Sequence, residues 1–282
     1  MKKIYSVILF GMLYACSIFH KTPLQQIRFT DTIENEAYTF IYQDMENSPE
    51  LNSLKSLYNL DSVAMLGNTE NEQALHLLNW THTRWKHNGS NKPSKSTTLT
   101  ILKEAETGMK FRCVEYGIVL KSVLACNGFK ARTLGLKTID VETKPSGAGH
   151  VLTEAWSAQH EKWFLLDAQF NLIPTLENKP LNAVEFQNAI IQKQHFKLID
   201  LNGEVSAKRR KKYLNFISEY LYYFDFKFDQ REVVYDSLFK VNDKTVLMLV
   251  PDGAKKPTKF QLKFDLNYVT YTNSLADFYR KP

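Results

Sequence analysis

The sequence predicts an α+β fold in which a buried helix carries a cysteine and packs on an antiparallel sheet. Helical patterns dominate the first half of the chain and strand-like runs the second, which is typical of segregated α+β folds. Residues 112–127 are apolar on most sides, as expected of a helix inside a fold. Two strand-like runs, 150–157 and 162–169, follow each other closely. With 282 residues, 44% of them hydrophobic, the chain is long enough to bury one full core.

The helical half is predicted from local signals. Residues 33–46 and 51–60 are amphipathic, and Thr69 with Glu72 forms a capping-box pattern at the start of a helix that should run to Asn88-Gly89. A polar loop follows, then a short helix over 100–106. The apolar helix 112–127 should end at Asn127-Gly128.

The strand-like half begins with residues 129–136. After the two runs named above, a helix should begin at Asn182 with Glu185 as its capping partner, and another should cover 208–223. Alternation and β-branched residues predict strands over 223–228, 245–250 and 259–272. These last strands should extend the sheet or form a small β appendage.

The first residues have the pattern of an export signal. Lys2 and Lys3 precede a short apolar run over 4–15, and the run ends at Cys16 in a pattern that resembles the bacterial lipobox. Lipidation of Cys16 is therefore predicted, with ordinary cleavage nearby or a retained anchor as alternatives. The expected organisation is a signal peptide over 1–16, a tether with helices over 17–68, a catalytic core over 69–200, and a C-terminal helix and β extension over 201–282. An exported protein of the cell envelope, lipid-anchored to the membrane on its periplasmic or surface side, is the expected product.

Charge and motifs exclude several function classes. The formal net charge of +6 is mild for this length, and the basic run 208–212 has no nucleic-acid motif beside it, so a solvated helix face is expected and no nucleic-acid partner. No HExxH or paired Cys-x-x-Cys motif occurs, so neither a metal site nor a cofactor is predicted.

Two cysteines remain after Cys16. Cys113 and Cys126 lie on the same predicted helix, about 20 Å apart, which is beyond disulfide reach. Both should therefore be free thiols. Cys126 has apolar neighbours and fits a core position.

Cys113 is the candidate nucleophile because it begins the buried helix. The positive end of the helix dipole favours a thiolate there, although a buried structural cysteine is an equally common outcome. A thiol nucleophile needs a base, and the two strand-like runs supply His150 and Asp167. A two-residue turn at 158–159 would place them directly opposite each other. A four-residue loop would shift the register by two and leave them diagonal, on the same face and within reach.

An aspartate beside a histidine fixes its tautomer and stabilises the imidazolium. The alternative is that His150 and Asp167 are neighbours by chance and have no catalytic role. The histidines at positions 76, 82, 87 and 195 fit surface or partly buried structural roles better.

The segments around these three residues resemble transglutaminase-like domains. Phe111-Arg112-Cys113-Val114-Glu115-Tyr116-Gly117 is similar to their nucleophile helix, Gly149-His150-Val151-Leu152-Thr153-Glu154-Ala155-Trp156 to their histidine strand, and Trp163-Phe164-Leu165-Leu166-Asp167 to their aspartate strand. The resemblance covers about residues 69–171. It implies a papain-like core in which Cys113, His150 and Asp167 form the catalytic triad.

The resemblance also implies the chemistry. Cys113 would attack a carbonyl, His150 would act as base and then acid, and Asp167 would orient His150. The backbone N–H of Cys113 and a side-chain donor, Trp80 or Gln169, would meet the oxyanion. Hydrolysis of amide bonds in a peptide or protein substrate is the expected activity. The alternatives are protein cross-linking by amine transfer and an inactive envelope binding or scaffold protein.

Overall fold

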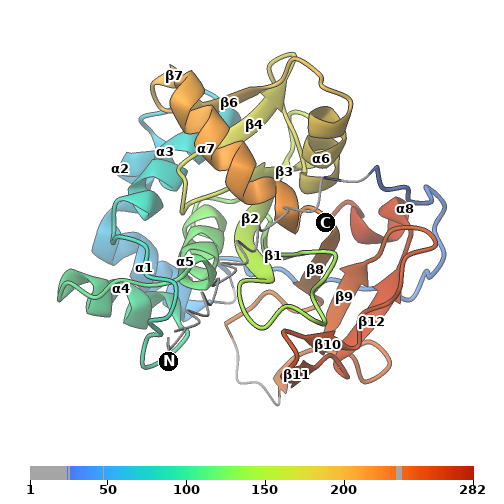
Figure 1. Ribbon diagram of the computed structural model, residues 1–282. Helices are drawn as coiled ribbons and strands as arrows, with labels where there is room; N and C mark the ends of the chain where they lie inside the picture. The colour runs from blue at the N-terminus through green and yellow to red at the C-terminus, as the bar shows by residue number, and fades with distance from the viewer. Residues whose placement is uncertain (1–23, 25, 47, 233–236) are drawn as a thin grey trace, which may run out of the picture.

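Figure 1 shows the fold as a computed structural model, which describes residues 24, 26–46, 48–232 and 237–282. Helices precede most of the strands, and they pack against a mixed sheet whose pairs are mainly antiparallel, which confirms the α+β class. The predicted signal segment and Cys16 lie outside the described residues.

Five helices form the N-terminal part of the fold. They are α1 (Pro49–Tyr58), α2 (Leu60–Ala64), α3 (Glu70–His82), α4 (Thr98–Glu106) and α5 (Cys113–Ala125). The capping box predicted at Thr69 is present and starts α3. This helix ends at His82, six residues before the predicted stop, and the Thr83 hydroxyl donates to the carbonyl of Trp80 at 2.9 Å. The predicted helix over 33–46 is wrong, because this stretch has no helix and forms a bridge from Ile41 to Asp229 in the C-terminal part of the chain.

The main sheet has six strands in the order β12-β9-β8-β1-β2-β3. They are β1 (Ala131–Lys137), β2 (Gly149–Ser157), β3 (Lys162–Leu166), β8 (Tyr223–Lys227), β9 (Val246–Leu249) and β12 (Val269–Thr272). Neighbours pair antiparallel except β9 and β12, which are parallel. The C-terminal strands thus extend the sheet that holds β2 and β3. The single strand predicted over 259–272 is instead broken into β10 (Lys259–Phe260), β11 (Phe264–Asp265) and β12.

The turn between β2 and β3 decides how the candidate residues meet. Ser157 pairs with Lys162, so the loop has four residues, and Thr153 pairs with Leu166. The two-residue turn is therefore not formed, and the diagonal alternative is the one observed. Because β3 ends opposite Thr153, the first residues of β2, including His150, have β1 on one side only.

Helices cover both faces of the sheet. On one face, α5 lies between β1 and β2 and the other N-terminal helices, and a core cluster joins these elements. On the other face, a second cluster joins the sheet to α6 (Ala183–Ile191), α7 (Ala207–Ile217), the 3-10 helix η1 (Ser218–Tyr220) and α8 (Leu275–Phe278). The Asn182–Glu185 capping box predicted for α6 is present. Strands β4 (Ile173–Leu176), β5 (Lys179–Pro180), β6 (Lys197–Asp200) and β7 (Gly203–Glu204), none of which was predicted, form a small sheet beside α7.

A buried ion pair connects these parts. Arg132 on β1 donates to Glu154 on β2 at 2.6 and 3.0 Å, and both side chains are fully buried. Glu154 also accepts from the Ala183 backbone at the start of α6, and Arg132 donates to the Phe278 carbonyl in α8. The pair satisfies buried polar groups of three separate elements, which is the condition under which a buried charge pair is tolerated.

Candidate active site

Cys113 is the first residue of α5. The residue before it, Arg112, is extended and caps the helix, with its backbone N–H donating to the fully buried Glu115 carboxylate at 3.0 Å. The Arg112 side chain donates to the same carboxylate, so Glu115 stabilises the start of the helix. The free N–H groups of the first turn surround the thiol with positive dipole ends, a setting that favours a thiolate.

A glycine lets α5 approach the histidine strand closely. A Cβ added to Gly117 would lie 2.9 Å from a Val151 methyl carbon and 3.3 Å from the Leu152 carbonyl oxygen, too close for any larger residue without a shift. The Thr153 hydroxyl also donates to the Gly117 carbonyl at 3.3 Å. This close packing sets the depth of α5 against β2 and so positions its first turn.

His150 and Asp167 form a buried pair. The Nε2 atom of His150 lies 2.9 Å from Oδ2 of Asp167, with only 2% and 0% of the two side chains exposed. Burial by itself would lower the pKa of His150. The Asp167 charge and hydrogen bonds to Asp167 and Cys113 outweigh burial and raise the pKa to about 10. The ring is therefore an imidazolium at neutral pH in the resting site.

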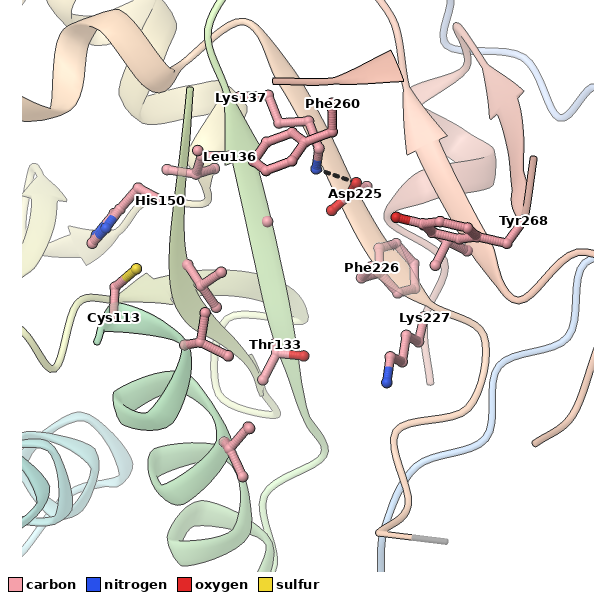
Figure 2. A pocket seen from close by; sticks show the side chains of 16 residues that line it. Cys113, Thr133, Leu136, Lys137, His150, Asp225, Phe226, Lys227, Phe260 and Tyr268 are labelled. Atoms are coloured by element: carbon pink, nitrogen blue, oxygen red, sulfur yellow. Dashed lines mark hydrogen bonds and ion pairs between the residues drawn. The ribbon is translucent and has the colours of Figure 1, made fainter. Parts of the chain in front are cut away.

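The thiol and the imidazole meet at the free edge of β2. His150 projects to the face covered by α7, whereas Cys113 comes from α5 on the opposite face. Because β3 has already ended there, Cys113 and His150 both line one end of the same pocket, and Cys113 contributes to the raised pKa of the imidazole. Figure 2 shows the sulfur directed toward the ring. Since Nε2 faces Asp167, Nδ1 is the nitrogen that serves Cys113.

Sequence reasoning missed a third partner of Asp167. The buried Tyr213 hydroxyl on α7 donates to Oδ2 at 3.1 Å, and the Phe170 backbone N–H donates to Oδ1 at 3.2 Å. Together with His150, these donors satisfy a carboxylate that has no access to water. Burial is the main cause that raises the pKa of Tyr213, and the charge of Asp167 raises it further. The phenol therefore stays protonated and can donate.

Aromatic rings enclose the far side of His150. Phe216 on α7 meets the imidazole edge-on at 5.1 Å between ring centres, with Tyr220 at 6.0 Å and Phe170 at 6.3 Å. The signal was present in the sequence as aromatic residues at positions 213, 216 and 220, one helical turn apart on the predicted helix. The opposite face of α7 carries the exposed Lys208, Lys211 and Lys212, as expected of a solvated basic face.

Two of the remaining histidines lie near Asp167 and His150. The Nδ1 atom of His82 is 2.8 Å from the carbonyl of Ala168, directly after Asp167. His87 lies in the loop after α3. Burial is the main cause that lowers its pKa, and the positive charge of His150 lowers it further. His76 is half-buried and His195 exposed, so neither departs from the predicted surface or structural role.

The two residues predicted as oxyanion donors do not line the pocket beside Cys113. The Trp80 ring packs edge-on against Tyr58 at 5.4 Å and lies under the Arg84 guanidinium at 4.5 Å. Gln169 is half-buried in the turn after Asp167, with its side-chain oxygen buried and lacking a hydrogen-bond partner.

Cys126 occupies the predicted core position. It is buried, its sulfur lies 3.3 Å from the Leu51 carbonyl, and burial raises its pKa to about 12. Both described cysteines are free. Only Cys113 thus combines a partly exposed sulfur with a neighbouring base.

A pocket of about 380 Å³ opens from Cys113 and His150 along the α5 face of the sheet. Val114, Ile118 and Val151 form its apolar wall near the thiol, and Phe226, Phe260 and Tyr268 line the other side. Gly135 on β1 contributes a floor without a side chain, over which the Asp225 carboxylate lies: a Cβ there would be 2.2 Å from Oδ1. Figure 2 shows the pocket between these residues.

Among the described residues, no group of three or more metal-ligating side chains comes together. In the same part of the chain, none of the helices combines the length and the apolar character that a bilayer span requires.

Comparisons with known proteins give distant structural matches. No family model matches the sequence, and no curated protein matches it either. A protein named as a candidate cysteine protease from Cytophaga hutchinsonii aligns at 13% identity with a TM-score of 0.35, over 43% of this chain and 38% of that one. The periplasmic domain of TgpA from Pseudomonas aeruginosa aligns at 17% identity with a TM-score of 0.34, over 44% and 47%. This chain therefore spans less than half the length of either structure.

Proposed function

We propose that the protein is a thiol enzyme that hydrolyses amide bonds in peptide or protein substrates through a thioester on Cys113. The observation that carries the proposal is that Cys113 and His150 line one end of the same pocket of about 380 Å³, with Asp167 bound to His150 at 2.9 Å. Each member has the environment its role needs: a helix N-terminus for the nucleophile, a buried imidazolium for the acid, and a fully hydrogen-bonded carboxylate to orient it.

The reaction begins with the thiolate of Cys113 and the imidazolium of His150. The sulfur attacks the substrate carbonyl carbon, and the carbonyl π electrons move to oxygen to give a tetrahedral oxyanion. Backbone N–H groups in the first turn of α5 are the nearest built-in donors for that oxygen. Gln169 or Trp80 would have to move toward the pocket to add a second donor.

Collapse of this intermediate breaks the carbon–nitrogen bond. The His150 imidazolium gives its proton to the leaving nitrogen, which departs as an amine, and the acyl group stays on sulfur as a thioester. Neutral His150 then takes a proton from water while the water oxygen attacks the thioester. The acid leaves, and the thiolate–imidazolium pair is restored.

Asp167 holds the ring in place through its hydrogen bond to Nε2, which leaves Nδ1 for the sulfur. Its second and third hydrogen bonds, from Tyr213 and the Phe170 backbone, keep the carboxylate in place while the ring changes charge. Aromatic side chains of α7 exclude water from this side, so substrate and water approach from the pocket.

Cleavage of a peptide library by the purified protein tests the proposal. The wild type should release new amino termini, Cys113→Ala should release none, and Cys126→Ala, the matched change at the buried thiol, should keep activity if it folds. Including a labelled primary amine distinguishes hydrolysis from amine transfer, because only the latter attaches the label. Cleavage that survives Cys113→Ala would refute the thiol mechanism, and absence of any acyl chemistry in the wild type would favour a binding role.

A natural location for this activity is the cell envelope, where the predicted signal segment would deliver it. Detection of a lipid-modified Cys16 at the mature N-terminus, by mass spectrometry of the protein from membranes, tests this part separately.

A further inference from the structure

The far end of the active-site pocket carries a lysine, Lys227, whose pKa is lowered by burial and partly restored by the charge of Asp229. Three charged side chains line the pocket besides His150: Lys137, Asp225 and Lys227. Lys137 and Asp225 form an ion pair over the floor, and both are largely buried. That pair leaves the pocket with one extra cation, the ammonium of Lys227.

Lys227 is free to meet a ligand. It is the exposed last residue of β8, and among the residues that the structure describes its ammonium has no ion-pair partner. The nearby acids are engaged elsewhere: Asp229 accepts from Arg231 at 2.7 Å, and Glu232 accepts from Ser122 at 2.9 Å. The Lys227 charge is felt by its neighbour Lys121, whose pKa is lowered to about 8, first by burial and further by this second ammonium.

The sheet register gives the distance between His150 and Lys227. His150 pairs with Leu136, which pairs with Phe224, and Lys227 is three residues further along β8. Two strand spacings and three residues of rise put the Lys227 Cα about 14 Å from that of His150. An extended peptide covers about 3.3 Å per residue. A group about three residues from the attacked carbonyl can therefore reach the flexible ammonium.

The path between the two ends suits a peptide with small or apolar side chains. Val114, Ile118 and Thr133 line it, and the Asp225 carboxylate occupies the space above Gly135. Figure 2 shows Thr133 between Cys113 and Lys227 in this view. The pocket thus offers a nucleophile at one end, apolar walls, and an ammonium at the other end.

We propose that the pocket selects substrates bearing a carboxylate about three residues from the cleaved bond, held by Lys227. The carboxylate is either an acidic side chain or a C-terminal carboxylate. The proposal rests on the function proposed above for Cys113, and its test reads binding without requiring turnover.

Iodoacetyl tripeptides that alkylate Cys113 provide this test. Four probes suffice. Three carry glycine in the first two positions and Glu, Gln or Lys in the third, each with an amidated C-terminus. The fourth is triglycine with a free C-terminal carboxylate. The wild type should react with the Glu probe or the free-acid probe about fivefold faster than with the Gln probe, the upper range for a solvent-exposed ion pair. High salt should reduce that ratio, because it screens the pair. Which of the two acidic probes is faster identifies the source of the carboxylate.

Two variants make the assignment specific. Lys227→Glu should reverse the preference so that the Lys probe reacts faster than the Glu probe. Lys211→Glu makes the same charge change on the exposed face of α7 and should leave the wild-type ratios unchanged. Equal rates with all probes in the wild type, or an unchanged preference in Lys227→Glu, would overturn the proposal.

Failure of the proposed function looks different. Cys113 would then react with iodoacetamide itself no faster than a model thiol, and His150→Ala would not change the rate. A charge preference without peptide cleavage would keep the carboxylate pocket and remove the hydrolase.

Discussion

Removing the Asp167 carboxylate should abolish the reactive thiolate while leaving the fold. In the wild type, the pKa of His150 is about 10, because the Asp167 charge and hydrogen bonds outweigh burial. About 99.9% of the rings are then protonated at pH 7, and the rise from 6.5 corresponds to about 5 kcal/mol of preference for the imidazolium. In Asp167→Ala, burial remains and only Cys113 opposes it, so the pKa should fall to 6.5 or below.

The consequence is measurable on the sulfur. Without an imidazolium partner, the Cys113 sulfur should react no faster than an ordinary thiol. Alkylation by iodoacetamide at pH 6 should therefore slow by about ten- to a hundredfold, and turnover should fall with it. Mass spectrometry locates the label, and Cys126 is too buried to compete.

A matched variant separates chemistry from stability. Asp277 is also fully buried and ion-paired, with Arg280 at 2.9 Å, but it lies on α8 away from the thiol. Asp277→Ala should lose stability and keep the rapid alkylation. Circular dichroism at the assay temperature confirms that both variants are folded. A folded Asp167→Ala protein that alkylates at the wild-type rate at pH 6 would refute the assignment of Asp167.

Three further predictions follow from single contacts. Tyr213→Phe removes one donor to Asp167 and should lower turnover about three- to tenfold, with about 1–2 kcal/mol of lost stability. The control variant Tyr279→Phe removes a hydroxyl bound to Glu154 and should affect stability alone. Equal turnover in the two variants would contradict this prediction. The folded pKa of His150 lies above its unfolded value, so the stabilising contribution of His150 is complete below pH 6.5 and is lost as pH rises toward 10. The difference in urea unfolding free energy between the wild type and His150→Ala should therefore shrink over that pH range. A growing difference would count against the ion pair. Glu154→Gln leaves the buried Arg132 charge uncompensated and should cost about 3 kcal/mol in urea unfolding, with a cost below about 1 kcal/mol showing that the guanidinium finds another partner.

Local signals predicted the elements that carry the site. The capping boxes at Thr69 and Asn182 have the predicted partners, because such caps depend on residues three positions apart. The apolar run after Cys113 is the buried helix α5, since a helix that is apolar on most sides has to lie inside a fold. Parity along β2 and β3 placed His150 and Asp167 on one face for either loop length.

The tertiary structure decided what local patterns leave open. The choice between a two- and a four-residue loop depended on the packing of both strands, and it set the diagonal contact of His150 with Asp167. The non-helical path of residues 33–46 depends on a bridge to a residue more than 180 positions away, which overrides its amphipathic pattern.

The sequence by itself determined which residues are chemically equipped: a thiol at a helix start and an imidazole and a carboxylate of matched strand parity. Only the tertiary structure brought α7 over them, because docking of a distant helix depends on shape and burial across the whole core rather than on residue spacing. That docking supplies Tyr213 to Asp167 and closes one side of His150. The pairing of β8 with β1 likewise places Lys227 in the pocket, since strands far apart in sequence become neighbours only through the sheet.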